Sequence, residues 1–171
     1  GLASAGVIAF SDDGVSLDDA DLLRQAFSRA KECGTLVICH CEDKTLVSRG
    51  VVNLGIISTC MGLRGISKES EYKRVARDLQ LAKDADAAVH IAHVSCRESV
   101  ELIAKAKKEG VLVTAETAPH YLAFTQEEVR GYDTNMKMNP PLRGEEDREA
   151  LIAGLKNGTI DVIASDHAPH T

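Results

Sequence analysis

Four short apolar runs in this chain end abruptly in acidic or histidine side chains, and this repeated arrangement constrains the fold more than any other feature. The runs cover residues 7–10, 36–39, 87–92 and 160–165. Strands that are apolar throughout are typical of parallel sheets covered by helices on both faces. In such α/β folds the site lies at the carboxyl ends of the strands. The side chains that follow the runs are therefore candidates for one shared site.

Amphipathic segments separate the apolar runs and predict helices between the strands. Apolar residues recur at helical spacing within residues 17–33, 69–83, 97–108 and 145–156. Ser16 is a candidate cap for the first helix, and Gly34 a candidate stop. Residues 111–116 form a fifth apolar run. The resulting alternation of strand and helix predicts an α/β fold with five parallel strands.

Two segments resist assignment to a helix or a strand. Four glycines interrupt residues 48–66, and glycine-rich stretches are typical of turns and loops. Residues 117–143 form a long insertion that contains the pair Pro140-Pro141, which is incompatible with a regular helix or a central strand.

Length and charge narrow the class of protein. The 171 residues suffice for one domain, but a complete eightfold barrel needs roughly 200 to 250 residues. We therefore expect a piece of a larger protein. The chain has 26 acidic and 20 basic side chains, a net charge of −6, which argues against a nucleic-acid or membrane partner. No long apolar span or leader is recognisable, so a cytoplasmic location is the expectation.

The five cysteines do not form a C-x-x-C pair, and their odd number does not indicate a disulfide framework. Cys39 and Cys41 flank His40, which raises the alternative of thiolate metal ligands. Side chains alternate between the faces of an extended strand, so both thiols would point away from any metal ion that His40 binds. We expect them to be small buried side chains.

Histidine and carboxylate groups delivered by separate strands suit zinc, and a carboxylate can bind one ion or bridge two. A bound divalent ion acidifies water toward neutrality, as a hydrolase requires. Because the same arrangement recurs, we predict that four residues are metal ligands. They are Asp13, His40, His93 and Asp166.

The other polar residues near these strand ends receive structural interpretations. We expect three histidines to be hydrogen-bonded structural residues, namely His90, His120 and His167. We expect three acids to be solvated loop residues or helix caps, namely Asp12, Glu42 and Asp43. Glu116 lies inside an apolar strand, where its carboxylate could orient a metal ligand.

Six blocks along the chain resemble, in order, those of the cyclic amidohydrolases. Within that family they are most similar to the dihydroorotases in which an aspartate replaces the carboxylated lysine of relatives. The blocks are Ser11-Asp12-Asp13-Gly14, His40-Cys41-Glu42-Asp43, His90-Ile91-Ala92-His93-Val94-Ser95, Thr114-Ala115-Glu116-Thr117-Ala118-Pro119-His120, Lys137-Met138-Asn139-Pro140-Pro141-Leu142-Arg143 and Ser165-Asp166-His167-Ala168-Pro169-His170.

This resemblance implies a partial (β/α)8 TIM barrel in which the five strands are numbers four to eight. Residues 1–171 would then be the C-terminal portion of a single barrel domain. The implied reaction is the reversible, zinc-dependent interconversion of N-carbamoyl-L-aspartate and L-dihydroorotate in pyrimidine biosynthesis. The partner would be this small-molecule substrate, and the cofactor would be two zinc ions.

The resemblance also assigns roles to individual residues. Asp13 would bridge the two ions, His40 and His93 would bind the second, and Asp166 would bind the first. Asp166 would in addition act as general base and then as the acid that protonates the leaving nitrogen. Substrate contacts would come from two further residues, Asn139 and His170.

The resemblance has one large departure. The family's His-x-His-x-Arg block, which supplies further ligands and a substrate-binding arginine, is not found in these 171 residues. We therefore expect the isolated chain to lack useful turnover. Unpaired barrel edges template association, which predicts a homo-oligomer or pairing with the missing segment.

Three alternatives remain open from the sequence. A hydantoinase or allantoinase would show a lysine near the position of Asp13. A catalytically inactive barrel could serve as a scaffold beside aspartate carbamoyltransferase. A metal-free α/β binding module would retain the fold without the chemistry.

Overall fold

The computed structural model describes residues 1–168, and these contain a five-stranded parallel sheet in the order β1-β2-β5-β6-β7. A separate pair of parallel strands, β3 and β4, lies outside this sheet. The strands are β1 (Ala9–Ser11), β2 (Leu36–Cys39), β3 (Val52–Asn53), β4 (Gly65–Ile66), β5 (Val89–Ile91), β6 (Val113–Thr117) and β7 (Val162–Ile163). The prediction of an α/β fold with five parallel strands is confirmed.

Helices connect successive strands of the main sheet, as the amphipathic segments predicted. The α-helices are α1 (Ala20–Glu32), α2 (Lys44–Val47), α3 (Ile56–Cys60), α4 (Glu69–Ala85), α5 (Arg97–Lys108), α6 (Pro119–Ala123) and α7 (Glu145–Lys156). Short 3-10 helices are η1 (Ala3–Ala5), η2 (Gln126–Gly131) and η3 (Thr134–Met136). Among residues 1–168, none of the helices has the length and apolar character needed to cross a bilayer.

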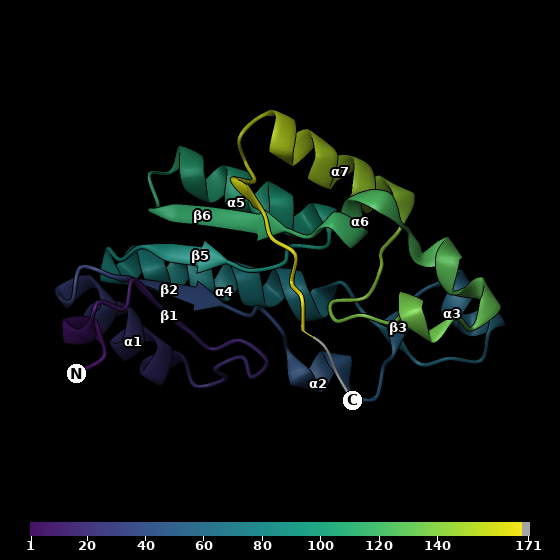
Figure 1. Cartoon of the computed structure of the whole chain (residues 1–171), viewed down its shortest axis with the longest axis horizontal. Helices are drawn as coiled ribbons and strands as arrows, with labels where there is room; N and C mark the ends of the chain where they lie inside the picture. Colours follow the sequence, from purple (N-terminus) through teal and green to yellow (C-terminus); the bar gives the residue numbers. More distant parts are fainter. Residues whose placement is uncertain (169–171) are drawn as a thin grey trace.

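All strands of the main sheet run in the same direction, so their carboxyl ends share one edge (Figure 1). The segment that carries α2, α3 and β3 lies at that end of the molecule, as does α6 (Figure 1). Helices α4 and α5 pack side by side, α1 packs on α4, and α7 packs on α5. This arrangement puts the ends of β1, β2 and β5 next to one another.

The first helix begins later than the sequence indicated. Its cap is Asp19, whose Oδ1 accepts hydrogen bonds from the backbone N–H groups of Asp21 (2.9 Å) and Leu22 (3.1 Å). The predicted cap, Ser16, is buried instead. A carboxylate caps a helix at least as well as a hydroxyl, so the prediction of Ser16 was wrong about which polar residue starts the helix.

The two unassigned segments contain short, closely packed elements. Residues 48–66 include β3, α3 and β4, and residues 117–143 include α6, η2 and η3. Gly65 allows the two short strands to approach closely, because a Cβ there would lie 2.4 Å from the Cα of Leu54. A small apolar cluster of Val52, Ile57 and Val129 joins the two segments.

The main core lies between the sheet and α1, α4, α5 and α7 and includes Leu23, Phe27, Ile91, Ile103 and Leu151. Among the described residues all five cysteines are free thiols, and Cys39, Cys41 and Cys96 are buried. The Sγ atom of Cys41 lies 3.4 Å from the Asp78 carboxylate on α4. Burial raises the pKa of both Cys39 and Cys41. These two thiols therefore pack as small buried side chains.

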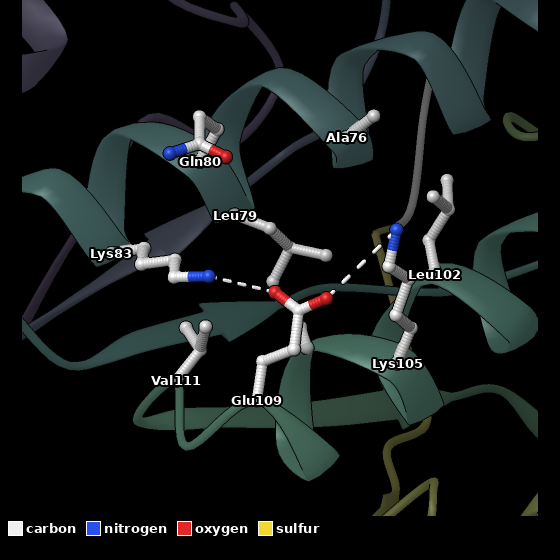
Figure 2. A pocket seen from close by; sticks show the side chains of 9 residues that line it. Ala76, Leu79, Gln80, Lys83, Leu102, Lys105, Glu109 and Val111 are labelled. Atoms are coloured by element: carbon white, nitrogen blue, oxygen red, sulfur yellow. Dashed lines mark hydrogen bonds and ion pairs between the residues drawn. The ribbon is translucent and has the colours of Figure 1, made fainter.

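A hollow of about 210 Å³ lies between α4 and α5, where Glu109 forms ion pairs with Lys83 (2.7 Å) and Lys105 (3.8 Å) (Figure 2). Both helices end beside this hollow, and the strands that follow them begin there. The hollow is consequently at the amino ends of the strands. The carboxyl ends, where the predicted ligands lie, are at the other edge of the sheet.

Candidate metal centre

Three of the four predicted ligands come together at the carboxyl edge of the sheet. Asp13 follows β1, His40 follows β2 and His93 follows β5, which are adjacent strands. One ligand atom from each residue lies within 4.8 Å of the other two. Both imidazoles are buried, whereas the Asp13 carboxylate is open to solvent. The sheet order thus brings together residues that are far apart in the sequence.

The donor atoms converge on one point. His40 Nδ1 and His93 Nε2 are 2.7 Å apart, so one ring nitrogen donates a hydrogen bond to the other. Asp13 Oδ1 lies 3.5 Å from His40 Nδ1 and 3.8 Å from His93 Nε2. Two nitrogens on one tetrahedral zinc are about 3.3 Å apart, given Zn–N distances of about 2.0 to 2.1 Å. The three residues therefore fit a zinc ion after a small separation of the two rings.

Asp12 holds the Asp13 loop against the end of β2. Its Oδ1 accepts a hydrogen bond from the backbone N–H of His40 (2.7 Å), and its Oδ2 accepts one from Leu17 (3.0 Å). Asp13 lies in the turn that follows, where its backbone N–H donates to the Ser11 hydroxyl (2.9 Å), and its carboxylate lies near the two histidines. Asp12 is thus a partly buried acid that bonds the backbone of a candidate ligand, which corrects the prediction of a solvated loop residue or helix cap.

His93 has an unusual backbone conformation, with a φ of 35°. A bulky residue at positive φ costs about 1 to 3 kcal/mol and persists only when its surroundings fix it. On one side, Val94 donates its N–H to the carbonyl of Glu116 (2.8 Å). The Thr117 hydroxyl donates to the carbonyl of Val94 (2.8 Å). The next strand thus holds the chain where it leaves β5.

Charge interactions within the cluster favour the charged forms of both Asp13 and His93. The interaction with the nearby His93 imidazole lowers the pKa of Asp13 to about 2. Burial opposes the charged form of His93, but the carboxylates around it, Asp13 foremost, outweigh burial and raise its pKa. A metal ion therefore competes with a proton for His93, because only a neutral imidazole ligates.

Glu42 contacts the cluster from the other side, which corrects its interpretation as a solvated loop acid. Its side chain is 15% exposed, and its Oε2 lies 3.7 Å from His40 Nε2. The same oxygen accepts a hydrogen bond from the Asn139 amide. The interaction with His40 lowers the pKa of Glu42. A carboxylate on the second ring nitrogen orients a ligating histidine, and strand alternation gave no signal for it.

Among the remaining polar residues near the strand ends, Asp43 and His90 have structural partners, whereas the prediction of a hydrogen-bonded His120 is not met, because its buried Nε2 has no hydrogen-bond partner among the described residues. Asp43 caps α2 by accepting the N–H of Thr45 (3.0 Å), as predicted. His90 Nδ1 contacts the Thr114 hydroxyl (2.8 Å), and its Nε2 contacts Glu116 (3.1 Å). His90 is therefore a hydrogen-bonded structural residue. The Glu116 carboxylate contacts this histidine, and the contact with His90, followed by interactions with the nearby His93, lowers the pKa of Glu116.

Asp166 lies apart from the three clustered ligands. Among residues 1–168, it is not part of the group whose donor atoms lie within 4.8 Å, and its backbone has a φ of 50°. It lines a cavity of about 440 Å³ together with Asn139, His120 and His167. The predicted substrate contact Asn139 therefore shares a cavity with Asp166. The other predicted contact, His170, lies outside the described residues.

Solved structures of hydantoinases resemble this fold closely. A dihydropyrimidinase from Brevibacillus agri NCHU1002 superposes with a TM-score of 0.80 and 28% identity over 99% of this chain and 39% of that chain. An L-hydantoinase from Arthrobacter aurescens gives a TM-score of 0.80 and 26% identity over 97% of this chain and 39% of its own. The fold is therefore that of the TIM-barrel amidohydrolases, of whose chains this one covers about two fifths.

Sequence comparison then specifies the family. Residues 1–99 match the family model described as dihydro-orotase-like, and the chain belongs to this family. A dihydroorotase from Caldanaerobacter subterraneus subsp. tengcongensis is 55% identical over 99% of this chain and 39% of its own length. One from Elusimicrobium minutum is 53% identical over the same shares. The chain spans about two fifths of the length of these relatives.

Proposed function

We propose that the protein carrying this segment is a dihydroorotase that interconverts L-dihydroorotate and N-carbamoyl-L-aspartate. The observation that carries the proposal is the convergence of Asp13, His40 and His93, in a chain more than half identical to proteins named dihydroorotase. Identity to the hydantoinase structures is lower, 26 to 28% for the two described above. Asp13 also stands where hydantoinases would be expected to carry a lysine.

We propose zinc as the metal, with Asp13, His40 and His93 holding it. The donor set supports this choice, because one carboxylate and two imidazoles suit zinc and leave room for water. When bound, the metal would polarise the ring carbonyl and lower the pKa of water. The second zinc ion and the bridging role of Asp13 follow from the resemblance alone and remain predictions.

The other residues of the site would handle the substrate and the proton. Asn139 and Asp166 line one cavity, which supports a substrate contact by the Asn139 amide and a proton transfer by the Asp166 carboxylate. In the proposed hydrolytic direction, Asp166 takes a proton from the attacking water and returns it to the leaving nitrogen. Glu42 contacts both His40 and Asn139, so its carboxylate would fix the position of the substrate-binding Asn139 relative to the metal ligand His40.

A substrate panel tests the proposal directly. The whole protein, loaded with zinc, should open dihydroorotate much faster than hydantoin or allantoin. His40→Ala should abolish both zinc retention and turnover, because it removes a buried ligand. As a matched control, His90→Gln changes a partly buried histidine that contacts Thr114 and Glu116, and it should retain zinc. Preferred hydrolysis of hydantoin or allantoin would refute the dihydroorotase proposal in favour of that related class.

Location and assembly remain predictions of the sequence. We propose a cytoplasmic homo-oligomer with a small-molecule substrate, in keeping with a biosynthetic role. Copurification would test an association with aspartate carbamoyltransferase. Zinc content and turnover measured on the same sample would show whether the protein is an inactive scaffold in that association.

A further inference from the structure

A buried charged network lies directly behind the loop that carries His93. Glu71, in the first turn of α4, is 4% exposed, and Arg143, which precedes α7, is 3% exposed. Their side chains approach within 3.7 Å. Buried charges are retained only with partners that offset the loss of water. The partners of this pair show what the network holds in place.

Glu71 holds the backbone that leads from His93 into the next helix. Helix α5 begins at Arg97, and its N-cap residue Cys96 makes no side-chain cap. Just before the helix, Glu71 Oε1 accepts the backbone N–H groups of Ser95 (3.0 Å) and Cys96 (3.3 Å). The same oxygen accepts the hydroxyl of Ser99 (2.8 Å). The carboxylate thereby fixes the backbone two residues beyond the metal ligand.

Ser95 joins Glu71 to Arg143. The Ser95 hydroxyl donates to Glu71 Oε2 and accepts a hydrogen bond from Arg143 Nε (3.1 Å). Arg143 also donates through Nη1 to Asn53 Oδ1 (2.8 Å) and to the carbonyl of Ile66 (3.0 Å). One guanidinium therefore ties the His93 loop to both β3 and β4. A lysine could not span these acceptors, because it lacks the planar fork of donors.

Arg143 also ends the segment that carries Asn139. Its carbonyl accepts the N–H of Gln126 (2.8 Å), and the Tyr121 hydroxyl donates to the carbonyl of Pro140 (2.7 Å) in the same buried region. The position of Asn139 and the position of His93 are consequently set by one shared group of contacts. Neither Arg143 nor Ser95 belongs to the clustered donor atoms.

We infer that Glu71, Ser95 and Arg143 act as positioning residues for the metal centre. They hold the positive-φ backbone of His93 so that its Nε2 faces His40 and Asp13, and they keep the Asn139 segment in register with it. The inference rests on the proposed function in that it assumes a metal at these three residues. It does not depend on which cyclic amide the protein hydrolyses.

Cobalt binding by the whole protein provides the test, with a readout separate from activity. Metal-free wild type is titrated with Co²⁺ alone, and the affinity and the visible absorption of the bound ion are recorded. The same titration is made on Arg143→Met and Ser95→Ala. The matched control is Asp147→Asn, because Asp147 is also a buried carboxylate that accepts an N–H at the start of α5, from Arg97 (3.0 Å).

Both test variants should bind cobalt about tenfold more weakly or worse, as is typical when a group that orients a ligand is removed. Their visible spectra should shift, because a change in the His93 geometry alters the ligand field. Asp147→Asn should lower stability yet keep the affinity and spectrum of wild type. If Arg143→Met does not fold, Ser95→Ala decides the question, because it removes only one hydroxyl.

Wild-type affinity and spectrum in a folded Ser95→Ala or Arg143→Met variant would overturn the inference, as would a wild-type protein that does not bind cobalt. A loss of the same size in Asp147→Asn would also overturn it, because general destabilisation would then explain every variant. Cobalt binding without dihydroorotate turnover would instead refute the proposed function and leave this inference standing.

Discussion

Replacing Asp147 with alanine should destabilise the protein far more than replacing the acid beside it. Asp147, in the first turn of α7, is fully buried. Its carboxylate accepts the N–H of Gly144 (3.1 Å) and that of Arg97 (3.0 Å), which are at the starts of α7 and α5. It also pairs with the Lys68 ammonium at 2.8 Å. One side chain therefore serves two helix ends and one cation.

The size of the loss follows from these contacts. A lost cap costs about 0.5 to 2 kcal/mol, and a buried donor left without a partner costs about 1 to 3 kcal/mol. Removing one partner of a buried ion pair costs about 3 to 5 kcal/mol in total. Because these contributions overlap at one carboxylate, we expect Asp147→Ala to lower the free energy of unfolding by about 3 to 5 kcal/mol.

Glu146→Ala is the matched control. The Glu146 side chain pairs with Lys68 at 3.1 Å, as Asp147 does, and with the Arg97 guanidinium at 3.5 Å, but it is 57% exposed. Exposed pairs contribute about 1 kcal/mol or less. Urea unfolding of the whole protein, followed by circular dichroism, measures both variants. A loss in Asp147→Ala no larger than that in Glu146→Ala would refute the argument that burial sets the magnitude.

Three further predictions concern the metal site, the thiols and the small strand pair. As the pH is lowered, metal affinity should already begin to fall while the pH is above 6.5, because the pKa of His93 is raised and a proton then competes with the metal for its imidazole. Affinity titrations across pH check this, and a flat profile would contradict it. Gly65→Ala should cost more than about 1 kcal/mol in urea unfolding, because its Cβ would meet the Leu54 backbone. Under native conditions, mass spectrometry after brief alkylation should find three buried thiols unmodified, namely Cys39, Cys41 and Cys96.

The regular parts of the fold could be predicted because local periodicity specifies them. The predicted helices at residues 97–108 and 145–156 coincide with α5 and α7. The helix predicted at residues 69–83 is α4, which ends two residues later, at Ala85. Residues 48–66 gave no such pattern. Their elements are held by contacts with distant residues, such as the bond of Asn53 with Arg143, which no local window contains.

Within the candidate site, residue type and spacing indicated the donors but not their supports. Asp13, His40 and His93 follow apolar runs and could be proposed from that pattern. Glu42 could not be distinguished from a solvated acid, because its burial depends on Asn139 reaching it from a remote segment. Glu71 gave no signal either, since a glutamate in the first turn of a helix is ordinarily exposed and here is buried against Ser95.

The different placement of Asp166 has a cause in the sheet. His40 and His93 follow β2 and β5. Each of these strands is hydrogen-bonded to a neighbouring strand on both sides, so its alignment with two neighbours determines where it ends. In the described sheet, Asp166 follows the edge strand β7, which pairs only with β6 and leaves Ile163 53% exposed. Asp13 also follows an edge strand, but the bond from His40 to the Asp12 carboxylate ties its loop to β2. Convergence of strand-end residues is therefore predictable where the strand is central or its loop is bonded to a central strand.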